Sequence, residues 1–140
     1  DYDLFPHIED HCSRVYAGML VALDRAVGMV LDALKMHDLE ENTLVVFSSD
    51  NGAPGYVHQP DLNKPYRGWK ATFFEGGVHV PLLMKWPARL VSGARVDDAV
   101  VSHMDIFPTV VAAATVAAAA VEKMCGDRLT VQKNAIEQIE

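Results

Sequence analysis

The sequence predicts an α/β fold in which part of a layered sheet is flanked by helices. Apolar residues recur with helical spacing over about 10–36, and a short β-branched run, TLVVFSS, follows at 43–49. A second apolar run, VHVPLLMKW, occupies 78–86 and is ended by Pro87. A helix followed by an almost wholly apolar strand is typical of βαβ-type sheets whose strands are covered on both faces. The 140 residues suffice for one ordinary domain or for a piece of a larger one.

The first element is predicted to be an amphipathic helix over about 10–36. Its apolar residues form one stripe that we expect to be buried: Val15, Met19, Leu23, Val27, Val30, Leu31 and Leu34. Asp24, Arg25 and Asp32 fall mostly off this stripe, as solvated side chains should. A polar break at 39–42 separates the helix from the strand that follows.

The second half of the chain is predicted to contain a brief strand and a helix. DDAVVS at 97–102 is interpreted as the strand. Ser102 with Asp105 fits a capping box, and Pro108 suits a first helical turn, so a helix should run through the alanines that follow. The polar stretch 126–140 has little periodicity and is expected to be loosely anchored.

Composition and charge narrow the class of partner. Hydrophobic residues make up 50% of the chain and charged residues 22%, which is a globular balance. The formal net charge of −7 argues against nucleic acid or an anionic membrane as the main partner. The longest apolar run, at 109–121, is too short and too rich in alanine to span a bilayer. Cys12 and Cys125 lie far apart without zinc-type spacing, so we interpret them as ordinary thiols.

Asp50 and Asn51 are the strongest candidates for a binding site. They follow the strand at 43–49, and ligands in open α/β sheets bind beyond the carboxyl ends of strands. A carboxylate and an amide carbonyl on a tight Gly52 turn make a hard oxygen site suited to Ca²⁺ or Mg²⁺. Two oxygens do not complete the roughly six to eight ligands of calcium. The alternative is that Asp-Asn-Gly is simply a turn, which these residues favour.

A long loop at 53–69 follows this pair. Structureless loops longer than about 12–15 residues are uncommon unless they are functional or disordered. The aromatic residues of this loop, among them Tyr66 and Trp69, argue against disorder. The loop leads to Lys70, whose ammonium group can meet an anionic oxygen, and we expect Glu-Gly-Gly at 75–77 to reverse the chain.

Three stretches together resemble the sulfatase family: NTLVVFSSDNG at 42–52, YRGWKATFFEGGVHVPLLMKWPARL at 66–90 and VSHMDIFPTVVAAA at 101–114. Their shared motifs are Asp-Asn-Gly after a strand, Gly-x-Lys-x-Thr-x-x-Glu-Gly-Gly, and Asp-x-x-Pro-Thr. The resemblance runs from about Tyr16 to Ala114, and this part of the chain is similar to the later half of the family's catalytic domain. It implies an alkaline-phosphatase-like α/β fold, with 1–115 as the later segment of that domain and 116–140 as a diverged, loosely ordered tail.

The resemblance also implies roles for individual residues. Asp50 and Asn51 match the family's late pair of divalent-cation ligands, usually for calcium, and Lys70 matches the lysine that contacts the substrate sulfate. The surrounding motif is implied to shape the site: Gly68, Thr72, Glu75, Gly76 and Gly77. A further motif is implied to start a structural helix: Asp105, Pro108 and Thr109.

The sequence departs from the family pattern at the nucleophile. In the family, a cysteine or serine in a Cys-x-Pro-Ser-Arg type motif is oxidised to formylglycine, and no such motif occurs here. Cys12 lacks the proline and the arginine register, so we expect the formylglycine upstream of these residues. His7, His11 and His58 do not align with the family's catalytic histidine and are interpreted as surface or loop residues.

The predicted function is hydrolysis of sulfuric esters, by a fragment that carries half of the cation site and the sulfate-contacting lysine. We expect the isolated chain to be inactive and its substrate to be the sulfate ester of a small molecule or a glycan. Self-association would cover open sheet edges. The sequence names no compartment, although an exported, periplasmic or lysosomal location fits the family. The alternatives are a phosphodiesterase or phosphonate hydrolase of the same superfamily, or a non-catalytic truncated homologue.

Overall fold

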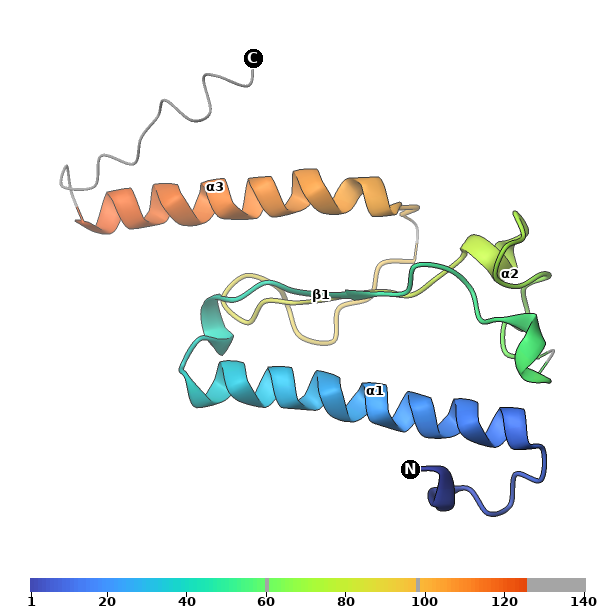
Figure 1. Ribbon diagram of the computed structural model, residues 1–140. Helices are drawn as coiled ribbons and strands as arrows, with labels where there is room; N and C mark the ends of the chain where they lie inside the picture. The colour runs from blue at the N-terminus through green and yellow to red at the C-terminus, as the bar shows by residue number, and fades with distance from the viewer. Residues whose placement is uncertain (60, 98, 126–140) are drawn as a thin grey trace. The chain divides into compact units, whose positions relative to one another are not determined.

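The computed structural model of the protein describes residues 1–59, 61–97 and 99–125, which fall into two units, Asp1–Ala94 and Arg95–Glu140. The described part of the first unit contains α1 (His11–Met36), β1 (Val45–Ser48), α2 (Glu75–Val78) and β2 (Leu82–Lys85), with short 3₁₀ turns η1 (Tyr2–Leu4), η2 (Glu40–Asn42) and η3 (Gly55–Val57). The described part of the second contains η4 (His103–Asp105) and α3 (Ile106–Cys125) (Figure 1).

α1 confirms the predicted amphipathic helix almost to the residue. Asp10 is its N-cap, since a carboxylate oxygen of Asp10 accepts a hydrogen bond from the Ser13 N–H at 2.8 Å. Lys35 lies in the last turn, where a cation suits the helix dipole. The helix ends at Met36, and the N–H of its C-cap residue, His37, donates to the Ala33 carbonyl oxygen.

β1 and β2 form an antiparallel pair, in a register that runs from Val45 opposite Lys85 to Ser48 opposite Leu82. These two strands are therefore not the parallel pair of a βαβ unit, and the predicted βαβ-type arrangement is not seen between them. A parallel pair would need a long crossover, usually a helix, but the described chain between these strands is a loop with only short helical turns. Phe47 remains 38% exposed, so the described residues do not cover β1 on both faces as predicted.

The other two predicted strands also differ from the structure. The run at 78–86 forms a strand only over β2, because its first residue completes the single turn of α2. Pro81 immediately precedes β2, where its missing N–H removes no bond from the strand pair. The predicted strand at 97–102 is absent from residues 97 and 99–102, which the structure describes as irregular.

The predicted start of the later helix is confirmed. The Ser102 hydroxyl accepts a hydrogen bond from the Met104 N–H at 3.2 Å, and the Asp105 carboxylate accepts one from the Ser102 N–H at 2.7 Å. This reciprocal capping box begins η4, and α3 continues from it. The polar stretch 126–140, predicted to be loosely anchored, lies outside the described residues.

The apolar stripe of α1 has the predicted spacing but is not buried. Among the described residues no hydrophobic side chain is buried, whereas the polar Ser13 is only 3% exposed. Met19, Leu23 and Val30 are 63%, 52% and 59% exposed. Of the described elements, α1 contacts the short turns η1, η2 and η3 but neither strand, so nothing among them is large enough to cover a helix of 26 residues.

Candidate functional site

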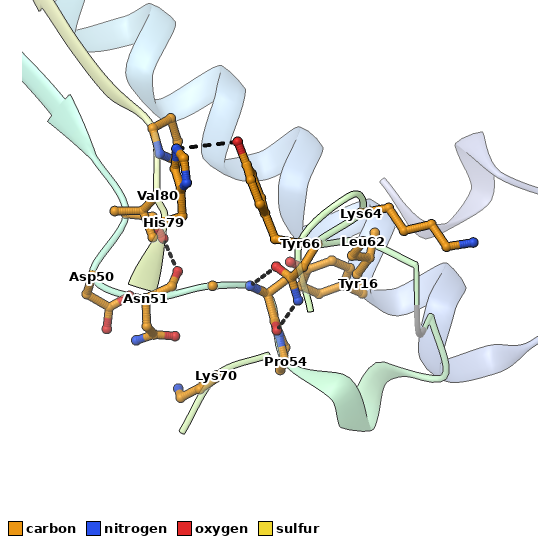
Figure 2. Close-up of a pocket in the computed structure, with 15 residues that line it drawn as sticks. Tyr16, Asp50, Asn51, Pro54, Leu62, Lys64, Tyr66, Lys70, His79 and Val80 are labelled. Carbon is orange, nitrogen blue, oxygen red and sulfur yellow. Dashed lines mark hydrogen bonds between the residues drawn. The ribbon is translucent and has the colours of Figure 1, made fainter. Parts of the chain in front are cut away.

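A cleft of about 530 Å³ opens where β1 ends (Figure 2). Its walls come from α1, the turn after β1, the long loop and the segment before β2: Tyr16, 49–54, 62–64, Tyr66, Lys70 and 79–81. Asp50, Asn51 and Lys70, the three residues that the sequence predicts for the site, all line this cleft. The fold therefore brings the ammonium group of Lys70 to the same cleft as the adjacent carboxylate and amide, which lie about 20 residues earlier in the sequence.

The turn that carries Asp50 and Asn51 is held by hydrogen bonds on both sides. The Ser49 hydroxyl donates to the Asn51 carbonyl oxygen at 2.7 Å, and the Gly52 N–H donates to the Gly77 carbonyl oxygen at 2.9 Å. A Cβ on Gly52 would overlap the carbonyl oxygen of Gly76. Glycine at this position therefore lets the acidic turn pack directly against the backbone of α2.

Lys70 is placed beside this turn by its own backbone. Its N–H donates to the Ala53 carbonyl oxygen at 3.2 Å. The chain then reverses sharply, because Ala71 adopts a left-handed conformation with φ of 70° and the Thr72 hydroxyl donates to the Trp69 carbonyl oxygen at 2.7 Å. Gly76 and Gly77 are buried against this reversal, which gives the glycine pair of the motif a steric reason.

The functional groups of the cleft are available to a ligand. Within the described residues, neither the Asp50 carboxylate nor the Lys70 Nζ has a hydrogen-bond or ion-pair partner, and the two do not pair with each other. Lys64, a second ammonium group that lines the cleft, is paired with Asp61 at 2.8 Å. The described part of the chain contains no group of three or more His, Cys, Asp and Glu side chains that could hold a metal. The oxygen donors of Asp50 and Asn51 match a hard cation in chemistry, but they supply only part of its ligands.

Asn63 is a cleft residue that the sequence analysis missed. Its side-chain oxygen accepts a hydrogen bond from the Ala53 N–H at 2.8 Å. Its side-chain nitrogen donates to the carbonyl oxygens of Ala53, at 3.0 Å, and Gly68, at 3.2 Å. An asparagine in a loop is usually a turn former, so nothing in the sequence distinguishes this one.

His79 was also missed, since its segment was predicted to be strand. Its ring stacks on Tyr66 with the centroids 4.2 Å apart and an interplanar angle of 23°. Nδ1 of His79 lies 3.3 Å from a carboxylate oxygen of Glu75. Figure 2 shows both rings at the wall of the cleft. The pair gives the site an aromatic side next to its charged groups.

The three histidines considered from sequence are surface residues, as predicted, and none of them lines this cleft. His7 is exposed, and His11 shares a hydrogen bond of 3.1 Å with the Tyr2 hydroxyl. Nδ1 of His58 lies 3.0 Å from Asp10, the N-cap of α1. Hydrogen bonds from the Ser13 hydroxyl and then His58 hold the pKa of Asp10 well below its ordinary value of 3.8.

Comparison with known proteins agrees with the resemblance seen in the sequence. The family model described as Sulfatase matches residues 6–116. Steryl-sulfatase of Rattus norvegicus is 42% identical over 101 residues, which cover 68% of this chain and 17% of that protein. A sulfatase of Formosa agariphila is 36% identical over 126 residues, which cover 83% of this chain and 22% of the relative.

A solved structure gives the same result in three dimensions. The crystal structure of Ps i-CgsB in complex with k-i-k-neocarrahexaose matches with a TM-score of 0.74 at 38% identity, covering 81% of this chain and 25% of that one. This likeness confirms the predicted α/β class of alkaline-phosphatase-like type. Among the described helices, none is long and apolar enough to cross a membrane. With a family match over most of its length and relatives of this identity, the chain belongs to the sulfatase family.

Proposed function

We propose that this chain is a segment of a sulfatase catalytic domain, in which it contributes to binding a divalent cation and the sulfate group of the substrate. The observation that carries the proposal is that Asp50, Asn51 and Lys70 line one cleft without pairing to each other. Oxygen donors and a cation at one concave site suit a ligand that combines a metal with an anionic group.

Asp50 and Asn51 are proposed to hold the cation, Ca²⁺ or Mg²⁺. Both are oxygen donors of the class that these ions prefer, and both lie on a turn whose backbone is fixed against α2. Calcium takes about six to eight oxygens, so the other ligands would come from water, substrate or segments outside these residues. When bound, the cation would neutralise negative charge on the sulfate oxygens.

Lys70 is proposed to contact the sulfate directly. Negative charge on the sulfate oxygens and on the departing ester oxygen changes as the sulfur–oxygen ester bond breaks, and a fixed ammonium group lowers the cost of that change. The hydrogen bond from the Lys70 N–H to Ala53 keeps the residue next to the cation ligands. Removal of one such oxyanion donor from an enzyme typically raises the barrier by about 3–4 kcal/mol, which sets the scale of the expected contribution.

The chain is proposed to act as part of a larger catalytic domain. It spans 17% of the rat relative and 25% of the solved structure. The apolar stripe of α1 stays partly or fully exposed within the described residues, as it would if other segments of such a domain covered it. The family's formylglycine motif is absent from the sequence, so the covalent catalyst would have to come from outside these residues.

The substrate is proposed to be the sulfate ester of a small molecule or a glycan. The rat relative is named a steryl-sulfatase, and the solved structure holds k-i-k-neocarrahexaose. Sulfate esters are favoured over phosphate esters because the matched relatives are named for sulfatase activity. The cleft carries both polar and aromatic side chains, which suits a ring that bears a charged ester.

Calcium titration of the purified chain tests the cation site. We expect calcium to shift the amide resonances of Asp50 and Asn51, and we expect Asp50→Ala to weaken binding at least tenfold, because it removes the only carboxylate of the pair. Asp32→Ala, which removes an exposed carboxylate from α1, serves as the matched control. Equal calcium affinity in wild type and Asp50→Ala would refute the site.

An activity assay tests the proposal that the nucleophile lies outside these residues. We expect no turnover of an aryl sulfate ester by the isolated chain in the presence of calcium, because the nucleophile is missing. The assay compares the wild-type chain with Lys70→Ala and with buffer alone. Turnover by the wild type that Lys70→Ala abolishes would show that the chain holds its own catalyst and would overturn this part of the proposal.

A further inference from the structure

We infer that Asn63 is a positioning residue that links two parts of the cleft. The cation half is the turn with Asp50 and Asn51, and the sulfate half is the segment with Lys70. This inference rests on the proposed function of Asp50, Asn51 and Lys70. It concerns a side chain that touches neither proposed ligand and that acts through the backbone. Its role would be to fix the distance between the two binding groups.

The hydrogen bonds of the Asn63 carboxamide reach both halves of the site. Its oxygen accepts from the Ala53 N–H at 2.8 Å, and its nitrogen donates to the Ala53 carbonyl oxygen at 3.0 Å. The same nitrogen donates to the Gly68 carbonyl oxygen at 3.2 Å. Ala53 lies two residues after Asn51, and Gly68 lies two residues before Lys70. One side chain therefore holds the segment that follows the cation ligands and the segment that precedes the lysine.

Ala53 is the point where these contacts meet. Its carbonyl oxygen accepts hydrogen bonds from both Asn63 and the Lys70 N–H, the latter at 3.2 Å. Its own N–H is taken by Asn63, so both of its backbone polar groups are fixed by one partly buried side chain. Rotation of the peptide group between Ala53 and Pro54, which carries this carbonyl, would break the contact to Lys70. Asn63 thereby sets the position of the lysine relative to the acidic turn.

The surrounding backbone has other hydrogen bonds that do not involve Asn63. The Gly52 N–H donates to the Gly77 carbonyl oxygen at 2.9 Å, and the Gly76 N–H donates to the Arg67 carbonyl oxygen at 2.7 Å. These bonds keep the acidic turn, α2 and the end of the loop together. Loss of the Asn63 carboxamide should therefore loosen the contact between Ala53 and Lys70 while the local fold remains.

A cation at Asp50 and Asn51 should strengthen sulfate binding at Lys70, because the two charges would act on one anion from fixed positions. Such coupling is reciprocal, so sulfate should strengthen calcium binding by the same factor. With Asn63 removed, Lys70 can move away from the turn. Each ion should then bind almost independently of the other.

The experiment uses the whole 140-residue chain. Inorganic sulfate is titrated with and without calcium, and binding is followed by amide chemical shifts. We expect calcium to strengthen sulfate binding about fivefold in wild type and by less than about 1.5-fold in Asn63→Ala. Amide hydrogen exchange at Lys70 should be roughly tenfold faster in the variant, since its bond to Ala53 is weakened.

Gln59→Ala is the matched control. The Gln59 amide belongs to the same loop, but it donates to the Ser13 hydroxyl at 3.0 Å and does not line the cleft. We expect this variant to keep the wild-type coupling. An equal loss of coupling in Gln59→Ala would overturn the inference, because it would show a general loosening of the loop.

The inference about Asn63 would also be overturned if Asn63→Ala kept the wild-type coupling between calcium and sulfate binding and the slow amide exchange of Lys70. Circular dichroism checks that α1 remains folded; a variant that loses helicity is replaced by Asn63→Ser, with the same criteria. A wild-type chain that binds neither ion would refute the proposed function instead. Lys70 exchange would then still decide the positioning role, since it requires no ligand.

Discussion

Gly52 allows the acidic turn with Asp50 and Asn51 to pack directly against α2. Substitution of this single residue therefore tests whether the packing supports the site. An added methyl group would overlap the Gly76 carbonyl oxygen. The backbone would have to move, because the obstacle is not a flexible side chain. We expect Gly52→Ala to lower the free energy of unfolding by about 1–3 kcal/mol, as overpacking does, and to weaken calcium binding. Denaturant unfolding and calcium titration measure the two effects.

Gly28→Ala provides the control for this substitution. Gly28 lies within α1, and a Cβ there would meet no atom within 4 Å. Alanine should therefore raise the free energy of unfolding by about 0.5–1 kcal/mol through helix propensity, with calcium affinity unchanged. The steric account of Gly52 fails if both variants are equally stable.

Some residues of the site can be predicted from the sequence and others cannot. Asp50, Asn51 and Lys70 lie in short sequence motifs, which can be recognised without knowledge of the fold. Asn63 and His79 differ because their roles depend on partners that only the fold supplies. The bonds of Asn63 go to backbone atoms of other segments, and His79 stacks on a ring 13 residues earlier in the chain. Neither partnership leaves a periodicity or a spacing to detect.

At the scale of elements, the start of α1 depends on a cluster of hydrogen bonds around Asp10. Its carboxylate accepts from the Ser13 N–H at 2.8 Å and from the Ser13 hydroxyl at 2.6 Å, and it contacts His58 at 3.0 Å. The Ser13 hydroxyl also lies 3.2 Å from the Val57 carbonyl oxygen, so the cluster ties the helix to the loop. These bonds favour the charged carboxylate and lower the pKa of Asp10.

This pKa shift predicts a pH dependence of stability. Because the pKa of Asp10 is lower in the folded chain, its contribution is fully present above the ordinary value of 3.8 and is lost as pH falls through the folded value. We expect Asp10→Ala to lower the unfolding temperature at neutral pH, and we expect the difference from wild type to shrink below about pH 4. Thermal unfolding followed by circular dichroism measures it.

Asp24→Ala is the control for Asp10, since Asp24 is an exposed carboxylate in the middle of the same helix. Among the described residues Asp24 makes none of the capping contacts of Asp10, so the effect of this substitution on the unfolding temperature should be small. A difference between Asp10→Ala and wild type that stays constant from neutral to acidic pH would contradict the assigned role of the N-cap.

Local signals predict helices better than strand pairing in this chain. α1 and the start of α3 follow from periodicity and capping residues, which act within a few positions. The direction of β2 relative to β1 depends instead on the path of the 33 residues at 49–81. That path is set by contacts such as those of Ala53 with Lys70 and of Gly52 with Gly77. No property of the two strands alone distinguishes an antiparallel return from a crossover.

At the scale of the whole molecule, apolar surface is the dominant feature. Within the described residues, hydrophobic side chains are partly or fully exposed, and on the stripe of α1 four of the seven are exposed and three are half-buried. Burial of such a stripe is what normally offsets the loss of chain entropy on folding. The chain should therefore gain stability from any partner that covers α1, and in isolation the nearest partner is a second copy.

We accordingly expect the purified chain to self-associate through the stripe of α1. Leu23, which is 52% exposed at the centre of the stripe, should contribute strongly, and Leu23→Glu should weaken association at least tenfold by placing a charge in the contact. Gly28→Glu adds the same charge off the stripe, where a Cβ meets no atom within 4 Å, and should change association little. Sedimentation velocity over a range of concentrations measures all three chains. A wild type that is monomeric at every concentration, or two variants with equal effects, would show that this stripe does not mediate association.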